Sequence, residues 1–169
     1  MNIATKSIAK RKRTVATPHI EVRVGVTSDA LAVTDLIDGF FHRTPWAKVI
    51  NFKRDQALKW LTMAIGSGYA PHALGFDGEE LVGMCSYHVF ATYTDPIAVM
   101  DECYVVPRLR RSDLGRRLVS LAIELARGDG CKVMNFPIAS GLPEQNGLMN
   151  MVGRHFGAVP VGMIFGKVL

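Results

Sequence analysis

The sequence predicts one α/β domain, built on a mixed, mostly antiparallel central sheet of six to seven strands with about four flanking helices. Strand-like apolar or alternating segments are interspersed with segments whose apolar residues recur at helical spacing. Their predicted order is strand, helix, helix, three strands, helix, strand, helix and then one bent strand or two short ones. This order confines parallel pairing to the central strand–helix–strand unit. A chain of 169 residues suits a single domain with a sizeable core.

The first half of the chain begins with a strand and ends with a hairpin. Residues 19–26 alternate between apolar and polar side chains, and Thr27 or Ser28 caps a helix that continues to Phe40. An Asp-Gly pair at residues 77–78 is typical of a hairpin turn. The other elements predicted here are a loop over 42–52, a helix from Asn51 or Lys53 to Ile65, and strands over 73–76 and 81–92.

Residues 97–127 form the centre of the predicted domain. An apolar, β-branched strand runs up to Pro107, and an amphipathic helix follows, capped by Ser112 or Asp113. The elements predicted after it are a strand over 132–137, a helix over 144–155, and the final strand or strands over 159–168. The turn and first helical turn of the central unit hold five arginines, Arg108, Arg110, Arg111, Arg116 and Arg117. Helix N-termini carry unpaired amides and a positive dipole end, so this turn is a predicted anion site.

The segment CYVVPRLRRSDLGRRL, residues 103–118, resembles the coenzyme A segment of the GNAT N-acetyltransferase superfamily. That segment has a strand ending in an apolar-x-Val-x-Pro pattern, followed by R/Q-x-x-G-x-G/A and a Leu-rich helix. Arg110 and Gly115 fit the first and last motif positions, and Asp113 replaces the first motif glycine. A weaker match in the tail aligns Asn146 with the family's N-x-x-A-x-x-l-Y-x-x-x-G-F pattern, with Gly153 in place of the tyrosine.

The resemblance covers about residues 19–169 and implies a GNAT-like fold with transfer of an acetyl group from acetyl-CoA to an amine. The acceptor is a small molecule or a protein, attacked directly in a ternary complex. The residues that the resemblance places at the cofactor are Cys103, Tyr104, Val105, Arg110, Arg111, Ser112, Asp113, Leu114, Gly115, Arg116 and Asn146.

The candidate catalytic groups lie on the central strand. Asp101 and Glu102 are adjacent, so a regular strand directs them to opposite faces, and one must point away from any single site. GNAT enzymes often place a general base on this strand, and we favour Glu102 over Asp101. Tyr104 is a candidate acid if its hydroxyl reaches the sulfur. The remaining candidates are His88 and Tyr87 for acid–base work, and His42 and Trp46, which either contact substrate or, for Trp46, simply pack.

The positive charge is concentrated at the N-terminus. Residues 1–17 contain five lysines and arginines and no acid, whereas the whole chain has a formal charge of +5. We therefore divide the chain into a basic arm, 1–17, and one domain, 18–169, whose net charge is neutral. Three cysteines without metal-ligand spacing favour a reducing, cytoplasmic compartment, and the sequence predicts no metal site and no membrane span.

Two other functions are compatible with these patterns. The first is a catalytically degenerate GNAT-fold structural or interaction protein anchored by its arm, such as a bacteriophage assembly or virion component. The second is a nucleic-acid binder that uses the arm and the arginine turn, although the neutral body argues against a large binding surface. The acceptor and the oligomeric state stay open.

Deleting residues 1–17 tests the role of the arm. Because these residues carry all of the net charge, the truncated protein should lose salt-dependent binding to nucleic acid and keep its thermal stability. Binding titrations at several salt concentrations measure this. Unchanged DNA binding by the truncated protein would assign the contact to the body of the domain.

Overall fold

The computed structural model describes residues 19–91, 95–138 and 145–160. In chain order the elements are β1 (Ile20–Val24), η1 (Thr27–Asp29), α1 (Ala30–Phe41), η2 (Pro45–Lys48), α2 (Arg54–Ser67), β2 (His72–Asp77), β3 (Glu80–Phe90), β4 (Ile97–Val105), η3 (Pro107–Leu109), α3 (Leu114–Gly128), β5 (Val133–Asn135) and α4 (Gln145–Phe156), where η marks a short 3₁₀ helix.

The strands form one sheet in the order β1-β2-β3-β4-β5. The first four are antiparallel to their neighbours, and β5 pairs with β4 in parallel. The predicted mixed, mostly antiparallel α/β fold is therefore confirmed. Within the described residues the sheet has five strands rather than six or seven. The strand or strands predicted over 159–168 fall mainly on residues 161–169, and the basic arm on residues 1–17, both outside the described part of the chain.

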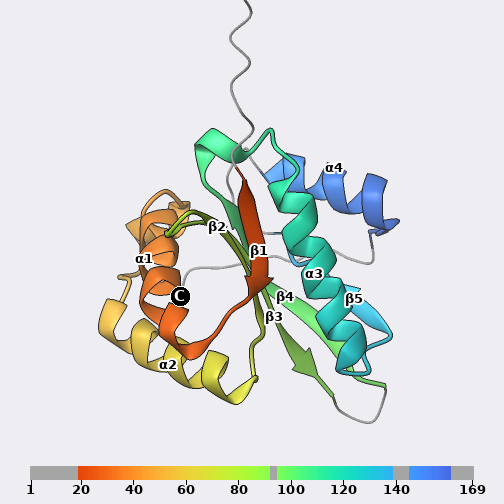
Figure 1. The fold of residues 1–169 in the computed structure, drawn as a ribbon, viewed down its shortest axis with the longest axis horizontal. Coiled ribbons are helices and arrows are strands. Elements are labelled where there is room, and N and C mark those ends of the chain that lie inside the picture. The colour runs from red at the N-terminus through yellow and green to blue at the C-terminus, as the bar shows by residue number, and fades with distance from the viewer. Residues whose placement is uncertain (1–18, 92–94, 139–144, 161–169) are drawn as a thin grey trace, which may run out of the picture.

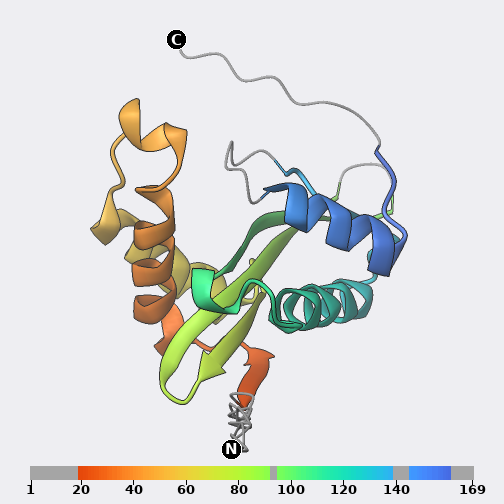
Figure 2. The ribbon, with the colours of Figure 1, turned by 90° about the horizontal axis from the view of Figure 1, so that it is seen from above.

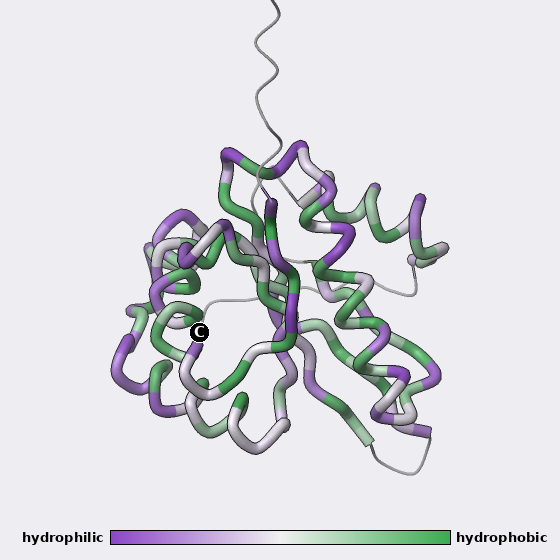
Figure 3. The backbone as a smooth tube through the Cα atoms, viewed as in Figure 1, coloured by the Kyte–Doolittle hydropathy of each residue, from purple (hydrophilic) through white to green (hydrophobic). Residues whose placement is uncertain are grey.

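Two helical layers enclose the sheet. Helices α1 and α2 lie on one side, and α3 and α4 lie on the other (Figures 1 and 2). Hydrophobic and hydrophilic residues alternate along α3 (Figure 3), and all of its buried residues are apolar. Leu114 and Leu118 are fully buried in the cluster under α3, and Val33 and Leu61 occupy the cluster under α1 and α2. Within the described residues, no helix combines the length and apolar character needed to cross a membrane.

The segment over residues 42–52 is more ordered than the predicted loop. Pro45 opens the short helix η2, a position where its fixed φ angle fits and its missing N–H is no loss. The helix predicted from Asn51 or Lys53 runs from Arg54 to Ser67 and is capped by Gly68, which has a left-handed φ of 71°. This segment places Trp46 on η2, where it lines the cavity described below.

Glycines in the sheet allow α3 to lie close to it. A Cβ atom on Gly75 would lie 2.7 Å from Leu114 Cδ1, and one on Gly83 would lie 3.0 Å from Leu118 Cδ1. A larger side chain at either position would push α3 outward. These glycines therefore set the distance between the sheet and the N-terminal end of α3.

We expect Gly83→Ala to destabilise the protein by about 1–3 kcal/mol, the usual cost of overpacking. The added methyl would also lie 3.2 Å from the Tyr104 carbonyl oxygen, which cannot move as a side chain does. Gly39→Ala in α1 is the control, because no neighbouring atom lies within 4 Å of its Cβ position. That variant should be neutral or stabilising by up to about 1 kcal/mol. Urea denaturation measures both, and equal stability of the two variants would refute this account of the packing.

Candidate functional site

The site begins where β4 and β5 part. The two strands pair only from Ile97 opposite Val133 to Val99 opposite Asn135, while β4 continues to Val105. On its other edge β4 stays bonded to β3, and the Val106 N–H donates to the Val82 carbonyl at 2.9 Å. Because neighbouring residues of an antiparallel strand bond to opposite sides, the backbone groups of Cys103 and Val105 face the open edge. The two strands therefore part at their C-terminal ends.

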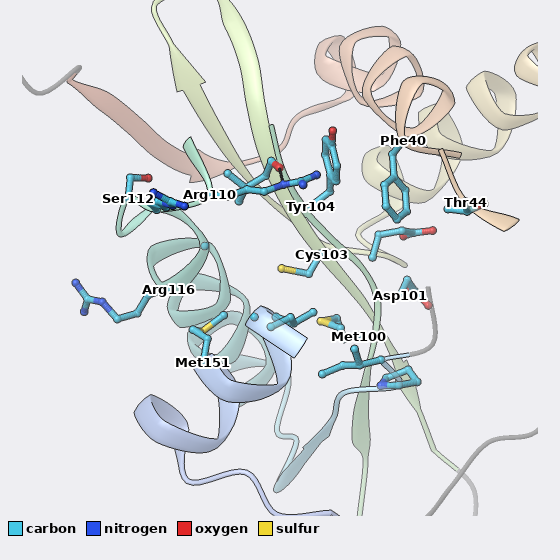
Figure 4. A pocket seen from close by; sticks show the side chains of 18 of the residues that line it. Phe40, Thr44, Met100, Asp101, Cys103, Tyr104, Arg110, Ser112, Arg116 and Met151 are labelled. Carbon is cyan, nitrogen blue, oxygen red and sulfur yellow. Dashed lines mark hydrogen bonds between the residues drawn. The ribbon is translucent and has the colours of Figure 1, made fainter. Parts of the chain in front are cut away.

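A cavity of about 830 Å³ occupies this opening. Figure 4 shows Cys103 near its middle, with Ser112 and Arg116 toward one end and Phe40, Thr44 and Asp101 toward the other. The predicted site residues that line it are Asp101, Glu102, Cys103, Tyr104, Val105, Arg110, Arg111, Ser112, Asp113, Gly115 and Arg116. The structure thus brings most of the predicted site together around one space, with α4 closing a side through Met151.

A β-bulge alters the predicted directions of the two carboxylates. Cys103 lies opposite Cys85 and Met100 lies opposite Tyr87, so Asp101 and Glu102 together face the single residue between them on β3. Such an extra residue interrupts the alternation of faces along a strand. Both carboxylates line the cavity, and the expectation that one of them must point away is wrong.

Ser86 is the residue opposite the bulge. Its hydroxyl donates a hydrogen bond to Glu102 Oε2 at 2.7 Å and accepts one from the Glu102 backbone N–H at 3.3 Å. Ser86 is fully buried, and the two bonds hold the Glu102 side chain in one position. Sequence reasoning missed this serine, because the contact joins two strands through a bulge.

The two carboxylates have different electrostatic surroundings. Burial raises the pKa of Glu102, and the hydrogen bond from Ser86 opposes that rise, while the nearby charge of Asp101 adds to it. Asp101 Oδ1 lies 2.7 Å from His88 Nδ1. A carboxylate with a raised pKa is the better proton acceptor near neutral pH. Of the two, Glu102 is therefore better suited to act as a general base.

Tyr104 lies between the aromatic and basic parts of the cavity. Its ring centroid is 4.9 Å from that of Phe40, and the Arg110 guanidinium carbon lies 5.7 Å from the ring centre. The Arg43 Nη1 group donates a hydrogen bond to the Tyr104 hydroxyl at 3.1 Å. The Arg110 Nε group donates to the Val105 carbonyl at 3.2 Å, so this arginine also shapes the open edge of β4.

The basic turn leads directly into α3. Ser112 Oγ accepts a hydrogen bond from the Leu114 N–H at 3.2 Å, while Asp113 occupies the N-cap position without a side-chain capping bond. The Arg117 N–H donates to the Asp113 carbonyl at 3.0 Å. Among the first-turn amides of the described helix, those of Gly115 and Arg116 are left to bind an anion. The Asp113 carboxylate lies 3.6 Å from Arg116 Nη2, which offsets its charge.

Several candidates lie away from the cavity. The Leu114 side chain is buried in the core and its amide is capped, and Asn146 is exposed and does not line the cavity. Tyr87 is buried and its hydroxyl donates to Asp129 at 2.7 Å, which together with burial raises its pKa. His42 pairs with Asp38 at 3.0 Å.

In the described ranges, no three His, Cys, Asp or Glu side chains gather to hold a metal ion.

The structure also adds residues that the motif did not identify. Phe40, Phe41 and Thr44 from the end of α1, Pro137 and Ile138 after β5, and Gly147, Leu148, Met151 and His155 from α4 line the same cavity. Trp46 lines it too, with 44% of its surface exposed. Amphipathic periodicity explains the apolar character of these residues, but it does not identify which cavity they reach.

Comparisons with known proteins agree with this geometry. The sequence profile of the acetyltransferase (GNAT) family matches residues 37–143. A search of curated proteins finds no match. Among solved structures, the aminoglycoside N-acetyltransferase AAC(6')-Iy in complex with CoA superposes with a TM-score of 0.68 at 13% identity, over 89% of this chain and 95% of that one. A ribosomal-protein-alanine N-acetyltransferase from Brucella melitensis gives 0.62 at 12% identity, over 89% and 97%. A transcriptional regulator from Bacillus halodurans gives 0.64 at 18% identity, over 87% and 100%.

Ser86→Ala tests the electrostatics of the bulge. Because the serine hydroxyl stabilises the ionised carboxylate, its loss should raise the pKa of Glu102 further above the ordinary value for glutamate. The Glu102 carboxyl is followed by ¹³C NMR titration and assigned with Glu102→Gln. Ser86→Thr keeps the hydroxyl and should leave the titration near that of the native protein. An unchanged titration in Ser86→Ala would show that the hydrogen bond has no such effect.

Proposed function

Because the chain belongs to the GNAT family of acetyltransferases, we propose that it transfers an acetyl group from acetyl-CoA to an amine by direct attack in a ternary complex. The observation that carries the proposal is the cavity where β4 extends beyond β5, between an arginine-rich helix N-terminus and two carboxylates. This arrangement joins an anion site, an open strand edge and a candidate base in one space.

The residues of this chain fit coenzyme A. The turn from Arg110 to Arg116 supplies guanidinium groups, and the amides of Gly115 and Arg116 supply N–H donors for phosphates. A Cβ atom on Gly115 would have only Val105 Cγ2 nearby, at 3.8 Å, so the surface there is open for close approach. Asp113 departs from the family motif, but Arg116 lies beside it and reduces its repulsion of a phosphate.

The chemistry follows from the groups that face the opening. When bound, acetyl-CoA supplies an acetyl thioester that an amine can attack. The Cys103 N–H at the open edge of β4 is the donor for a carbonyl oxygen that gains negative charge. Glu102 removes the proton from the amine, with Asp101 the alternative base. Tyr104 remains the proposed acid, which would give a proton to the sulfur of the leaving CoA thiolate, and Arg43 orients its hydroxyl.

The wider setting remains a proposal from composition. The cytoplasmic compartment, and contact of the arm with nucleic acid or a protein assembly, follow from the three cysteines and from the five bases of residues 1–17. Asp113 and Gly153, which depart from the family motifs, are the residues on which the degenerate structural alternative would rest. No contact in the described residues favours it over catalysis, and we do not propose it.

Calorimetric titration with acetyl-CoA tests the cofactor site. We expect binding by the native protein and a rise in Kd of about tenfold or more, equivalent to about 1.4 kcal/mol, in Gly115→Val, whose side chain would fill the space for the phosphates. Gly128→Val, exposed at the other end of α3 with no neighbouring atom within 4 Å of its Cβ position, is the matched control. No binding by the native protein at millimolar acetyl-CoA would refute the proposed function.

Glu102→Gln tests the proposed base. The variant keeps the shape of the side chain but cannot accept the proton, so kcat should fall about a hundredfold while acetyl-CoA affinity is retained. In the native enzyme, kcat should rise with pH as Glu102 loses its proton, because only the carboxylate is a base. This rising limb of the pH–rate profile should be absent from the variant. Release of the CoA thiol measures the rate. If Asp101→Asn instead removes the limb and Glu102→Gln does not, Asp101 is the base.

A further inference from the structure

The end of the cavity beyond Cys103 is aromatic. The arginine turn, where we propose that the CoA phosphates bind, lies at the opposite end, so the aromatic end is available for the acceptor amine (Figure 4). Phe40 and Phe41 come from the last turn of α1, and Trp46 comes from η2. Phe41 packs against Phe52, with ring centroids 5.5 Å apart, so the wall is supported from behind. Trp46 remains 44% exposed at the edge of this wall.

The described residues at this end carry few charged groups. In the described residues that line it, the carboxylates are Asp101 and Glu102, and Asp101 is paired with His88 at 2.7 Å. Arg43 brings a positive charge to the Tyr104 hydroxyl. One ammonium group would find a partner at Glu102, whereas the described residues around it offer a second ammonium group no carboxylate other than Asp101, which is already paired with His88. Burying a charge without an opposite charge is costly, so a polycation gains little here.

We infer that the acceptor is a primary amine with a single ammonium group on an apolar, arylalkyl body. The inference rests on the proposed function and names the substrate class of that same site. The carboxylates attract the ammonium, and the rings of Phe40, Phe41 and Trp46 remove the apolar body from water. Such a pocket, largely apolar with a few polar groups that fix orientation, is typical of small-molecule sites.

Initial rates of CoA thiol release test this with the full-length protein. The acceptors are 2-phenylethylamine, spermidine, the aminoglycoside sisomicin and a tripeptide with a free N-terminal alanine. We expect kcat/KM for 2-phenylethylamine to exceed each of the others at least tenfold. Trp46→Ala should raise the KM for 2-phenylethylamine about tenfold by removing part of the aromatic wall, with the KM for acetyl-CoA unchanged.

Trp60→Ala is the matched control. Trp60 lies on α2, is 45% exposed, nearly the same as Trp46, and is not among the residues that line the cavity. This variant should keep both KM values. A preference for spermidine, sisomicin or the peptide, or equal effects of the two tryptophan variants, would overturn the inference and leave the proposed function standing. Acetylation of none of the four amines, together with no calorimetric binding of acetyl-CoA, would overturn both.

Discussion

The site depends on a difference in length between two parallel neighbours. β5 ends at Asn135 after three paired residues, whereas β4 continues from its partner Val99 to Val105. A strand edge without a neighbour exposes backbone donors and acceptors that must be satisfied by something else. Here the exposed edge forms the floor of a cavity, and the Arg110 side chain already bonds to one of its carbonyls. The opening is therefore a property of strand pairing, and the surrounding side chains give it chemical character.

The packing of α3 brings the anion site to that opening. Leu114 and Leu118 pack against the sheet where Gly75 and Gly83 leave room, so the first turn of α3 lies close to the sheet. This turn combines arginine side chains with free amides, two features that bind phosphate through different physical effects. The same apolar packing that stabilises the domain therefore places the proposed cofactor site.

The bulge in β4 gives the two adjacent carboxylates separate roles. Both reach the cavity, but Asp101 pairs with His88 and Glu102 bonds to the buried Ser86. Their surroundings therefore differ, and burial raises the pKa of Glu102. The difference favours Glu102 as the proton acceptor and leaves Asp101 to shape the charge of the acceptor end.

The sequence by itself determined the parts of this protein that are contiguous along the chain. The order of the elements, and the strand, basic turn and amphipathic helix over residues 97–127, could be predicted because propensity, capping and helical spacing act over short separations. The tertiary structure alone decided the bulge that turns Asp101 and Glu102 into one cavity, the contact of Ser86 with Glu102, and the arrival of Phe40 and Trp46 at the same site. Packing also decided that Leu114 is buried in the core and that neither Leu114 nor Asn146 lines the cavity. These features depend on strand register and on packing between elements far apart in the chain, and local residue patterns do not encode either.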